Sequence, residues 1–399
     1  MVEEQTFDII IAGGGMVGAA CALALIGQGL EIGVIEPRPP RTHWHADERD
    51  LRVSAINRAS QRFLERLDVW ETIRDLGVCP YREMRVWDAL NGAEIHFDAQ
   101  GLNEPDLGHI IENQIIQRAL WESLSACEEI KLISPVSIID LETEAQGIRL
   151  RLSDGCALRA RLLIGADGRD SLIRSLSGIE TQAWDYGQRA IIAHVQPTHW
   201  HRATAWQRFL PTGPLALLPL ADGRCALVWS ADEDYAAELM ALDEARFNQA
   251  LTDASESRLG ALSLVSQRLA IPLRAHHARA YVRPGVALIG DAAHAIHPLA
   301  GQGVNLGFMD AAALAWAIQM GLQHGRDIAG LWTLRRYERA RRGANLLMLQ
   351  AMNLFKALFG NREPAIVQTR ALGLGLAERL DPLKQLFMRQ ALGLDNEFA

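Results

Sequence analysis

The residues best suited to chemistry are glycines and acids at three turns along the chain. Gly13, Gly15 and Gly18 form a Gly-x-Gly-x-x-Gly pattern between the apolar run 7–12 and a helical pattern rich in alanine and leucine. There the first glycine permits a tight turn, the second lets the backbone approach a pyrophosphate, and the third lets helix and strand pack closely. The N–H groups at the helix start would face the phosphates. Glu36, at the end of the next apolar run, would accept hydrogen bonds from a ribose diol. The alternative is a plain glycine turn beside a solvent-facing glutamate.

The second turn carries Asp167 and Gly168 at the end of the apolar, strand-like run 157–164. Taken alone, it indicates a strand-to-helix turn whose helix is capped by Asp170 or Ser171. In combination with the other two turns, it indicates a further part of a nucleotide site.

The third turn carries Gly290 and Asp291 after the apolar run 286–289. An aspartate at this point can accept a hydrogen bond from a ribityl hydroxyl. His294 and His297 are three residues apart and suggest a metal pair, but no third ligand is nearby in the sequence. We therefore expect no metal site.

The segment 298–303 is rich in glycine and leads into an Ala-rich helical pattern over 305–321. N–H groups at such a helix start can stabilise negative charge on a reduced flavin ring. A glycine turn near the start of the chain, together with a Gly-Asp turn far downstream, indicates that both parts of the chain hold one extended cofactor. That cofactor is most simply FAD.

The composition is that of a folded, acidic protein. The 399 residues are 49% hydrophobic and carry a net charge of −8, which argues against disorder and against nucleic-acid binding. The five cysteines include no Cys-x-x-Cys pair, so we expect a reducing compartment. The polar first residues do not form a signal peptide, and no apolar stretch of about 20 residues occurs. We expect a cytoplasmic protein, with a peripheral position at the inner membrane as the alternative.

The order of the apolar runs predicts an α/β fold with a Rossmann-like unit. The runs 7–12 and 31–36, with a helical pattern between them, form a strand–helix–strand unit. Strand-like alternation over 189–230 separates this unit from the run 286–289, so the nucleotide unit is predicted to be discontinuous, with a β-sheet substrate domain inserted. The tail is predicted to be helical, with interruptions near Gly360–Pro364 and at Asp381-Pro382. We expect an FAD-binding domain over 1–78, 108–178 and 279–340, a substrate domain over 79–107 and 179–278, and a helical C-terminal region over 341–399.

Together these features resemble the class A flavoprotein aromatic hydroxylases, the family of para-hydroxybenzoate hydroxylase. The resemblance is closer to the bacterial hydroxylases of ubiquinone biosynthesis and covers nearly the whole chain. Within that group it is strongest for members acting on an octaprenylphenol, and next for those acting on a methoxy-methyl benzoquinol ring. The segments that carry it are 51–57, 107–113, 184–186, 297–307, 334–339 and 389–394.

The resemblance assigns contacts to the cofactor by position. It implies that Arg52 lies near the flavin, that Asn113 lies against it, and that Pro298 lies over the isoalloxazine ring. Asp167 and Gly168 match a motif implicated in binding both FAD and a nicotinamide cofactor. The loop that would hold the pyrimidine edge of the ring matches Gly301, Gly303 and Asn305.

The resemblance also implies the reaction. Reduced flavin would take up O₂ as a C4a-hydroperoxide and pass one oxygen to an electron-rich phenol or benzoquinol ring that bears a polyprenyl chain. The protein would orient the ring and exclude water. No catalytic acid or base is assigned; His194, Tyr186 and His297 are the candidates for contacting a phenol. The reductant would be NAD(P)H or a redox protein, and Arg38 either contacts a nicotinamide phosphate or is simply solvated.

Residues 206–220 supply apolar and aromatic strand faces for the inserted domain. We expect Phe209, Leu217 and Pro219 to line an apolar tunnel for the prenyl chain, with ordinary core packing as the alternative. Residues 345–392 are amphipathic. They would form either a docking face for a membrane or a partner of the ubiquinone pathway, or an intramolecular or oligomer face, which we favour. We therefore expect a homo-oligomer.

Two other kinds of function stay open at this point. One is another flavoprotein of the same fold, such as a reductase or a hydroxylase of a non-prenylated aromatic compound. The other is a non-catalytic carrier of prenyl groups that retains the nucleotide fold. The intact glycine loop over 297–307 favours the hydroxylase over the carrier.

Overall fold

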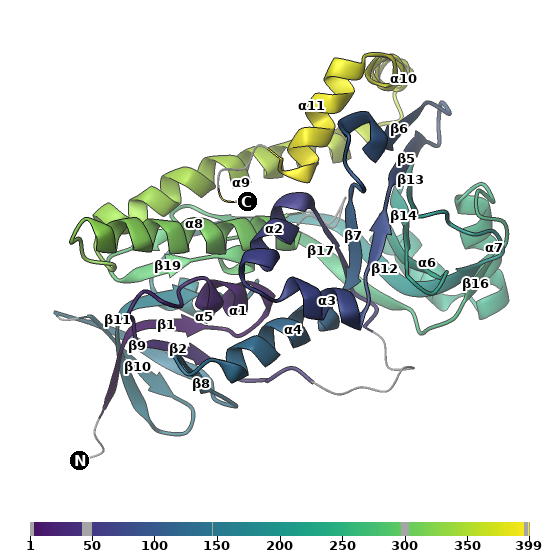
Figure 1. Ribbon diagram of the computed structural model, residues 1–399. Coiled ribbons are helices and arrows are strands. Elements are labelled where there is room, and N and C mark those ends of the chain that lie inside the picture. The colour runs from purple at the N-terminus through teal and green to yellow at the C-terminus, as the bar shows by residue number, and fades with distance from the viewer. Residues whose placement is uncertain (1–3, 42–49, 146, 297–302, 395–397, 399) are drawn as a thin grey trace.

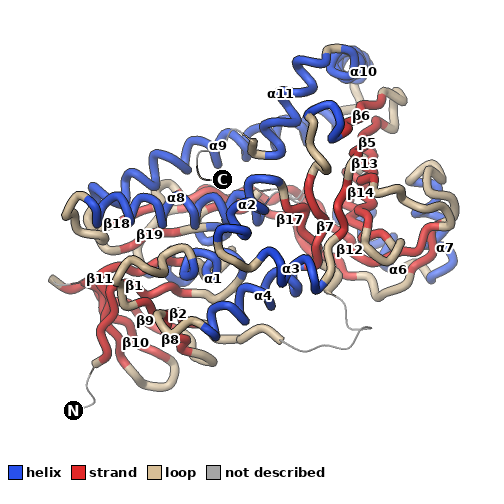
Figure 2. The backbone as a smooth tube through the Cα atoms, viewed as in Figure 1, coloured by secondary structure: helices blue, strands red, loops and turns tan. Residues whose placement is uncertain are grey.

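The computed structural model describes residues 4–41, 50–145, 147–296, 303–394 and 398. Figure 1 shows two large sheets beside each other and a long helix, α9 (Leu331–Gly360), that extends along both. Figure 2 shows that strands lie toward both ends of the molecule, that helices lie between and above them, and that further helices lie at the outer end of the second sheet.

An eight-stranded sheet carries the first unit. Its strands are β1 (Gln5–Ala12), β2 (Ile32–Ile35), β8 (Ile130–Ile133), β9 (Ile138–Glu144), β10 (Gly147–Leu152), β11 (Ala157–Gly165), β18 (Val282–Arg283) and β19 (Val286–Leu288). The neighbours β19, β11, β1, β2 and β8 are all parallel. Ile9, Ile10 and Ile11 are completely buried, as expected for an apolar run in a parallel sheet that is covered on both faces.

Helices cover this sheet and share its core. They are α1 (Met16–Leu23), α4 (Asn113–Ala126), α5 (Leu172–Leu176) and α8 (Gly303–Gln323). α1 contacts both α4 and α8, and α8 contacts α9. The buried residues Ala19, Ala20 and Ala22 of α1 leave room for this close packing.

A nine-stranded sheet carries the second unit. Its strands are β5 (Glu83–Asp88), β6 (Glu94–Asp98), β12 (Thr181–Pro197), β13 (Thr204–Leu210), β14 (Gly213–Pro219), β15 (Cys225–Asp232), β16 (Leu262–Leu264), β17 (Leu269–Ala278) and β20 (His294–Ala295). β20 lies just beyond the third turn and pairs with β17. The third turn therefore connects the two sheets. From the sequence we had placed the whole of 279–340 in the FAD-binding domain. The domain boundaries as a set stay a prediction.

The two faces of the second sheet have different surroundings. α6 (Glu233–Ala241) and α7 (Glu244–Ala254) cover one face, where Leu215, Leu217 and Trp229 are fully buried. Ala216 and Leu218 are half-buried on the opposite face, because alternate residues of a strand point to opposite sides. Leu218 there packs in a cluster with residues of a small sheet, made of β3 (Val53–Ile56), β4 (Cys79–Tyr81) and β7 (Gly108–Glu112).

The C-terminal region consists of α9, α10 (Pro364–Arg379) and α11 (Asp381–Leu392), so the predicted interruptions are confirmed. A proline lies in the first turn of both α10 and α11, where its missing N–H has no helical partner to lose. Gly393 ends α11 with a φ of +66°. The remaining helices are α2 (Arg58–Arg66), α3 (Trp70–Leu76) and the 3₁₀ turns η1 (Ala99–Leu102) and η2 (Gly290–Ala292). In the part of the chain that is described, no helix has the length and apolar character needed to cross a membrane.

A buried ion pair fastens the C-terminal helices to the second sheet. Nε and Nη2 of Arg370, in α10, both donate to the carboxylate of Asp88, in β5. Nη1 of the same arginine donates to three backbone carbonyls at and just beyond the end of α9. The side chains of both residues are at most 1% exposed. Phe359 of α9 stacks on Phe209 of β13, with ring centroids 3.9 Å apart.

Removal of one partner from this pair should destabilise the folded protein. We expect Arg370→Met to leave Asp88 as an uncompensated buried charge and to lower the free energy of unfolding by about 3–5 kcal/mol. The same substitution at the exposed Arg379 of α10 is the matched control and should change stability by less than about 0.5 kcal/mol. Denaturant unfolding of both variants measures this, and equal stabilities would contradict the assignment.

Candidate functional site

The three turns meet at one edge of the first sheet. Ala12 ends β1, and its neighbours across the sheet are Ile35 and Gly165, which end β2 and β11. Leu288, at the end of β19, is the neighbour of Gly165. The backbone N–H groups of the next residues continue this pairing: that of Gly13 donates to Ile35 over 2.8 Å, and that of Ala166 donates to Ala12 over 2.8 Å. All three turns thus leave the carboxyl edge of the sheet side by side.

The glycines of the first turn differ in what surrounds them. Gly13 has a φ of +104°, and a Cβ atom there would lie 2.5 Å from the carbonyl oxygen of Ala166 in the second turn. A Cβ on Gly18 would lie 2.0 Å from the carbonyl oxygen of Gly13. A Cβ on Gly15 would meet nothing within 4 Å, and no side chain caps α1, which begins at the next residue. The backbone at Gly15 is therefore open to an incoming group, and the start of α1 has N–H groups to offer it.

Glu36 lies against the first turn and is partly buried, so it is not the solvent-facing glutamate of the alternative interpretation. Its Oε2 accepts a 2.7 Å hydrogen bond from the N–H of Gly14, and its Oε1 accepts one of 2.8 Å from the N–H of Arg38. Each carboxylate oxygen keeps a second acceptor site. The side chain of Arg38 is exposed.

The second turn is a capped helix start placed beside the first turn. Ser171 caps α5 by accepting from the N–H of Arg174 over 2.9 Å, which confirms one of the two predicted caps. Asp167 also serves this turn: its two oxygens accept from the hydroxyl of Ser171 and from the N–H of Ile173. Gly168 adopts a φ of +82°. The carboxylate of Asp167 is thus engaged within the turn.

Arg52 and Asn113 meet at the small sheet. The N–H of Asn113 donates to the carbonyl of Arg52 over 3.0 Å, and the Oδ1 of Asn113 accepts from the hydroxyl of Ser54 over 2.7 Å. The side chain of Arg52 is 65% exposed. Asn305, near the start of α8, is buried and donates from Nδ2 to the carbonyl of Ala55 over 2.8 Å. It therefore joins α8 to the small sheet.

At the third turn, Gly290 and Gly307 allow close packing around one residue of α1. Cβ atoms built on them would lie 3.2 Å and 2.6 Å from side-chain carbons of Val17. The side chain of Asp291 is exposed, yet the surrounding protein partly desolvates its carboxyl and raises its pKa. Among the described residues, this carboxylate has no hydrogen-bond donor. An accessible aspartate without such a donor is suited to accept from a ligand hydroxyl.

Pro298 and Gly301, together with His297, lie outside the described residues. Gly303 is the first residue of α8, and a Cβ there would meet nothing within 4 Å. The start of α8 follows the third turn in the chain, and its first glycine is open.

A buried polar network beneath the third turn was not foreseen from the sequence. Asp310 of α8 is completely buried, and its Oδ2 accepts from the N–H of Gly290 over 3.1 Å and lies 2.5 Å from Nε2 of His294. Its Oδ1 accepts from Arg341 and Asn345 of α9, both over 2.9 Å. Burial alone would raise the pKa of Asp310, but His294 and Arg341 outweigh it and lower the pKa to about 2. The sequence holds no signal of this contact, because Gly290 and Asp310 are 20 residues apart and the contact depends on how α8 packs beneath the third turn.

Two histidines extend the network toward the second sheet. His276 and His277 of β17 are buried; Nε2 of His276 lies 2.9 Å from the carbonyl oxygen of Asp291, and Nε2 of His277 lies 3.1 Å from the hydroxyl of Tyr281. Desolvation lowers the pKa of each histidine to about 4. Both are therefore neutral at physiological pH.

The three residues predicted to line a substrate tunnel do not share a face. Phe209 lies on the face of the second sheet that packs on the C-terminal helices. Leu217 pairs with Trp206 and lies on the opposite face, in the core beneath α6 and α7. Pro219 alternates with Leu218 and therefore shares the face of Leu217. Phe209 therefore cannot share one wall with Leu217 and Pro219, because alternate residues of a strand point to opposite faces.

The phenol candidates have different positions. His194 is buried. It is the cross-strand neighbour of Ala226, which in turn pairs with Leu218, so His194 lies on the same face of the second sheet as Ala216 and Leu218, which we call the half-buried face. The hydroxyl of Tyr186 donates to Oδ1 of Asn353 in α9 over 2.6 Å, and burial raises its pKa to about 12. Tyr186 thus ties α9 to the second sheet.

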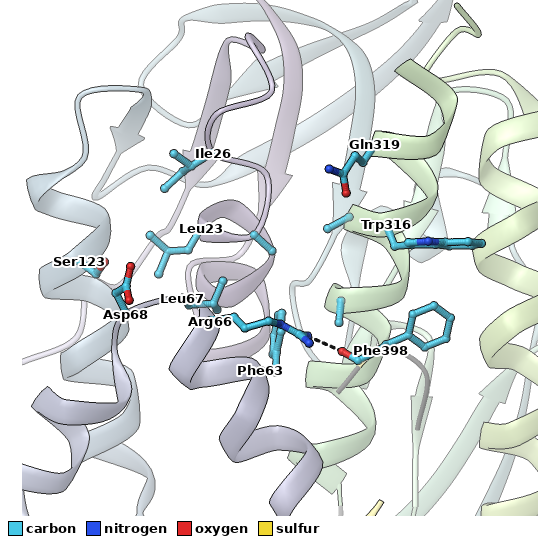
Figure 3. Close-up of a pocket in the computed structure, with 13 residues that line it drawn as sticks. Leu23, Ile26, Phe63, Arg66, Leu67, Asp68, Ser123, Trp316, Gln319 and Phe398 are labelled. Atoms are coloured by element: carbon cyan, nitrogen blue, oxygen red, sulfur yellow. Dashed lines mark hydrogen bonds between the residues drawn. The ribbon is translucent and has the colours of Figure 1, made fainter. Parts of the chain in front are cut away.

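A separate cavity of about 600 Å³ lies between α1, α2 and α8, and Figure 3 shows the residues that line it. Leu23, Phe63, Trp316 and Phe398 are among its lining residues, and Arg66 donates to the carbonyl of Phe398. Leu23 is the last residue of α1, so this cavity lies at the end of the helix opposite the glycine turn. It is not the place where the three turns meet.

Acidification should weaken the folded state between about pH 6.5 and pH 4. A histidine in the unfolded chain has a pKa of about 6.5, whereas His276 and His277 in the folded protein bind protons only near pH 4. Over this range the unfolded state binds more protons, so the free energy of unfolding falls as the pH falls. Changing both residues to Gln should flatten a profile of denaturation midpoint against pH, and His324→Gln, at an exposed position, should not. A double variant with the slope of the unmodified protein would refute this.

Comparison with known proteins agrees with this geometry. Residues 6–351 match a family model described as an FAD binding domain, which includes all three turns and ends within α9. Among solved structures, PqsL, a probable FAD-dependent monooxygenase from Pseudomonas aeruginosa, superposes with a TM-score of 0.78 over 93% of this chain and 99% of its own. With 23% identity, this likeness concerns the fold alone.

Curated relatives are more similar in sequence. The chain is 40% identical to the 3-demethoxyubiquinol 3-hydroxylase of Escherichia coli, over 98% of this chain and 100% of the relative. It is 36% identical to the ubiquinone hydroxylase UbiL of Rhodospirillum rubrum, over 98% and 90% of the two chains. It is 35% identical to the human ubiquinone biosynthesis monooxygenase COQ6, over 96% and 92%. The chain therefore belongs to the FAD-dependent aromatic-ring monooxygenases, in the family of the hydroxylases of ubiquinone biosynthesis.

Proposed function

We propose that this protein hydroxylates the aromatic ring of a polyprenylated phenol or benzoquinol. The observation that carries the proposal is the meeting of three distant turns at one sheet edge, with Asp291 left to accept a ligand hydroxyl. The E. coli relative is named for its action on 3-demethoxyubiquinol, which supports a benzoquinol ring with a prenyl chain at least as well as an octaprenylphenol. A hydrophobic substrate and O₂ are then the two reactants.

The three turns supply the groups that would hold FAD. The N–H groups at the start of α1 would bind the pyrophosphate past the open Gly15, and Glu36 would accept from the ribose with its remaining acceptor sites. Asp291 would accept from the ribityl chain. Gly13 and Gly18 would act indirectly, since they let the turn and helix pack closely enough to form the site.

Other predicted contacts would take different parts. Arg52 has an exposed guanidinium, and Asn113 keeps its NH₂ group to donate toward the ring while Ser54 holds its oxygen. Asp167 and Asn305 are engaged within the protein, so we infer that they position the turns. Gly168, Gly290 and Gly303 would contribute backbone, and Pro298 and Gly301 remain candidates from the sequence alone.

When bound, the flavin supplies the activation of O₂ and the electrophilic oxygen. The protein's own tasks are to orient the phenol ring and to exclude water. His194 is the residue that we assign to the phenol oxygen, because it is buried on the half-buried face of the second sheet. The electron donor would be NAD(P)H or a redox protein.

We assign the prenyl chain to the half-buried face rather than to the original set of three residues. Phe209 stays in this wall, and Ala216 and Leu218 replace Leu217 and Pro219. Ala216 and Leu218 are apolar and partly accessible although they lie on an inner face of the molecule, and Phe209 on the same face is buried against Phe359. A fully packed core would leave no such surface.

Gly15→Ala tests the cofactor site. Alanine tolerates the extended backbone at Gly15 and meets no neighbour there, so the apoprotein should fold with unchanged stability. Its methyl group would stand where the pyrophosphate approaches, so the FAD dissociation constant should rise about tenfold or more, or about 1.4 kcal/mol. Fluorescence titration of apoprotein measures this, with Gly343→Ala on the exposed side of α9 as control. Unchanged FAD affinity in Gly15→Ala would rule out this approach.

Leu218→Asp tests the substrate wall. A carboxylate in an apolar wall should raise KM for a prenylated phenol about tenfold or more while FAD stays bound. Leu90→Asp, at an exposed turn 43% open to solvent, is the matched control and should behave as the unmodified enzyme. The assignment fails if product forms from the prenylated phenol with equal KM in both variants.

A further inference from the structure

The C-terminal helices expose an unusual number of large apolar side chains. Nine of them, between 38% and 76% exposed, form what we call the C-terminal apolar tip: Leu346, Leu347, Leu354, Phe355, Leu372, Leu376, Leu380, Leu386 and Phe387. Scattered single apolar residues on a surface need no explanation, but a group confined to one region marks an interaction site. Figure 1 shows α10, α11 and the end of α9 projecting beyond the sheets.

These helices already have an apolar interior, so the exposed residues are not a misplaced core. Phe359 and Ala377 pack on Phe209 and the second sheet, and Met388 and Leu392 of α11 pack in a cluster with Tyr81. The buried pair of Arg370 with Asp88 holds α10 in place. The helices are thus fixed on one side and apolar on the other. From the sequence we favoured an intramolecular or oligomer face. An intramolecular face does not account for the nine exposed residues, which leaves an oligomer face and a membrane to be distinguished.

The charge of the region points to the kind of partner. The range 342–394 contains six basic and three acidic residues, not counting Arg370, which is paired internally. This segment is therefore positively charged, although the whole chain has a net charge of −8. The basic residues are Arg342, Lys356, Arg362, Arg379, Lys384 and Arg389, and the acidic ones are Glu363, Glu378 and Asp381. Exposed leucine and phenylalanine side chains can enter a bilayer surface, and an excess of basic residues is attracted to anionic lipid. The region therefore suits a bilayer that contains anionic lipid. A second copy of the chain would bind through the same surface, because a two-fold interface uses the same patch on both subunits. The positive charges of the two patches would then repel each other.

We propose that the C-terminal apolar tip docks on the surface of an anionic phospholipid bilayer. The reason for such docking rests on the proposed function, because a polyprenylated substrate resides in lipid. α9 contacts β13 and β14, and its Phe359 stacks on Phe209. The same helices therefore join the bilayer to the proposed wall for the prenyl chain. The tip lies in the interface and does not cross the bilayer.

The test is vesicle binding by the holoenzyme in the absence of substrate. We expect co-sedimentation with vesicles of phosphatidylcholine and phosphatidylglycerol, weaker binding to phosphatidylcholine alone, and a decrease with salt. The variant with Leu347, Leu354, Leu372 and Leu376 all changed to Ser should bind at least tenfold more weakly. Its FAD content and its turnover of a short-chain, water-soluble phenol should not change.

Two controls separate the alternatives. The matched variant changes four exposed apolar residues outside the region, Leu90, Ile139, Leu172 and Val265, to Ser and should bind vesicles normally. Arg362→Glu with Arg379→Glu should weaken binding to the anionic vesicles more than to neutral ones.

Two results would overturn the proposal. One is equal vesicle binding by the unmodified protein and the tip variant, including no binding by either. The other is an unmodified protein that is oligomeric by light scattering and becomes monomeric in the tip variant, because a second copy would then cover the tip. Tip-dependent vesicle binding by a protein that hydroxylates no prenylated phenol would support the docking surface and refute the proposed function.

Discussion

The site depends on the register of four parallel strands. β2, β1, β11 and β19 end level with one another, so the turns that follow them leave the sheet at the same edge. Backbone contact then sets their spacing: Gly13 lies against Ala166, and Val17 lies between Gly290 and Gly307. A side chain at any of these glycines would force the turns apart. Segments separated by some 270 residues can therefore contact one elongated ligand only while this packing is intact.

Buried charge supports the third turn in addition to backbone packing. Asp310 is removed from water, which is costly for a carboxylate unless its acceptor sites are filled. Here Gly290, His294, Arg341 and Asn345 fill them. The network includes residues of α8, α9, η2 and β20, and so it makes the position of the third turn depend on the C-terminal helices. This is one physical reason why α9 belongs to the site although its own residues are not proposed to contact the flavin.

The sequence predicted the parts of the site that are governed by local rules. The turn at Gly13, the close packing at Gly18, the cap at Ser171 and the prolines in the first turns of α10 and α11 follow from backbone geometry and could be inferred from spacing. Side-chain partners across the fold could not. Nothing near Asn305 in the sequence indicates that its side chain binds the backbone of Ala55, 250 residues away.

Sequence reasoning also failed where the direction of a side chain matters. Phe209 and Leu217 lie in adjacent strands of similar composition, and only the register of β13 with β14 shows that they point to opposite faces. The amphipathic pattern of the C-terminal region was recognised, but a helix pattern does not tell which apolar residues a neighbouring element covers. The exposure of Leu347 and Leu372 required the tertiary structure.

The central claim is that one FAD molecule is held by all three turns at the carboxyl edge of the first sheet. A crystal structure of the purified protein with FAD tests it most directly. The account predicts the pyrophosphate at the start of α1 beside Gly15 and the ribityl chain within hydrogen-bond distance of Asp291. An FAD molecule seated elsewhere, for instance in the cavity beside Leu23 and Trp316, with the three turns unliganded, would contradict it.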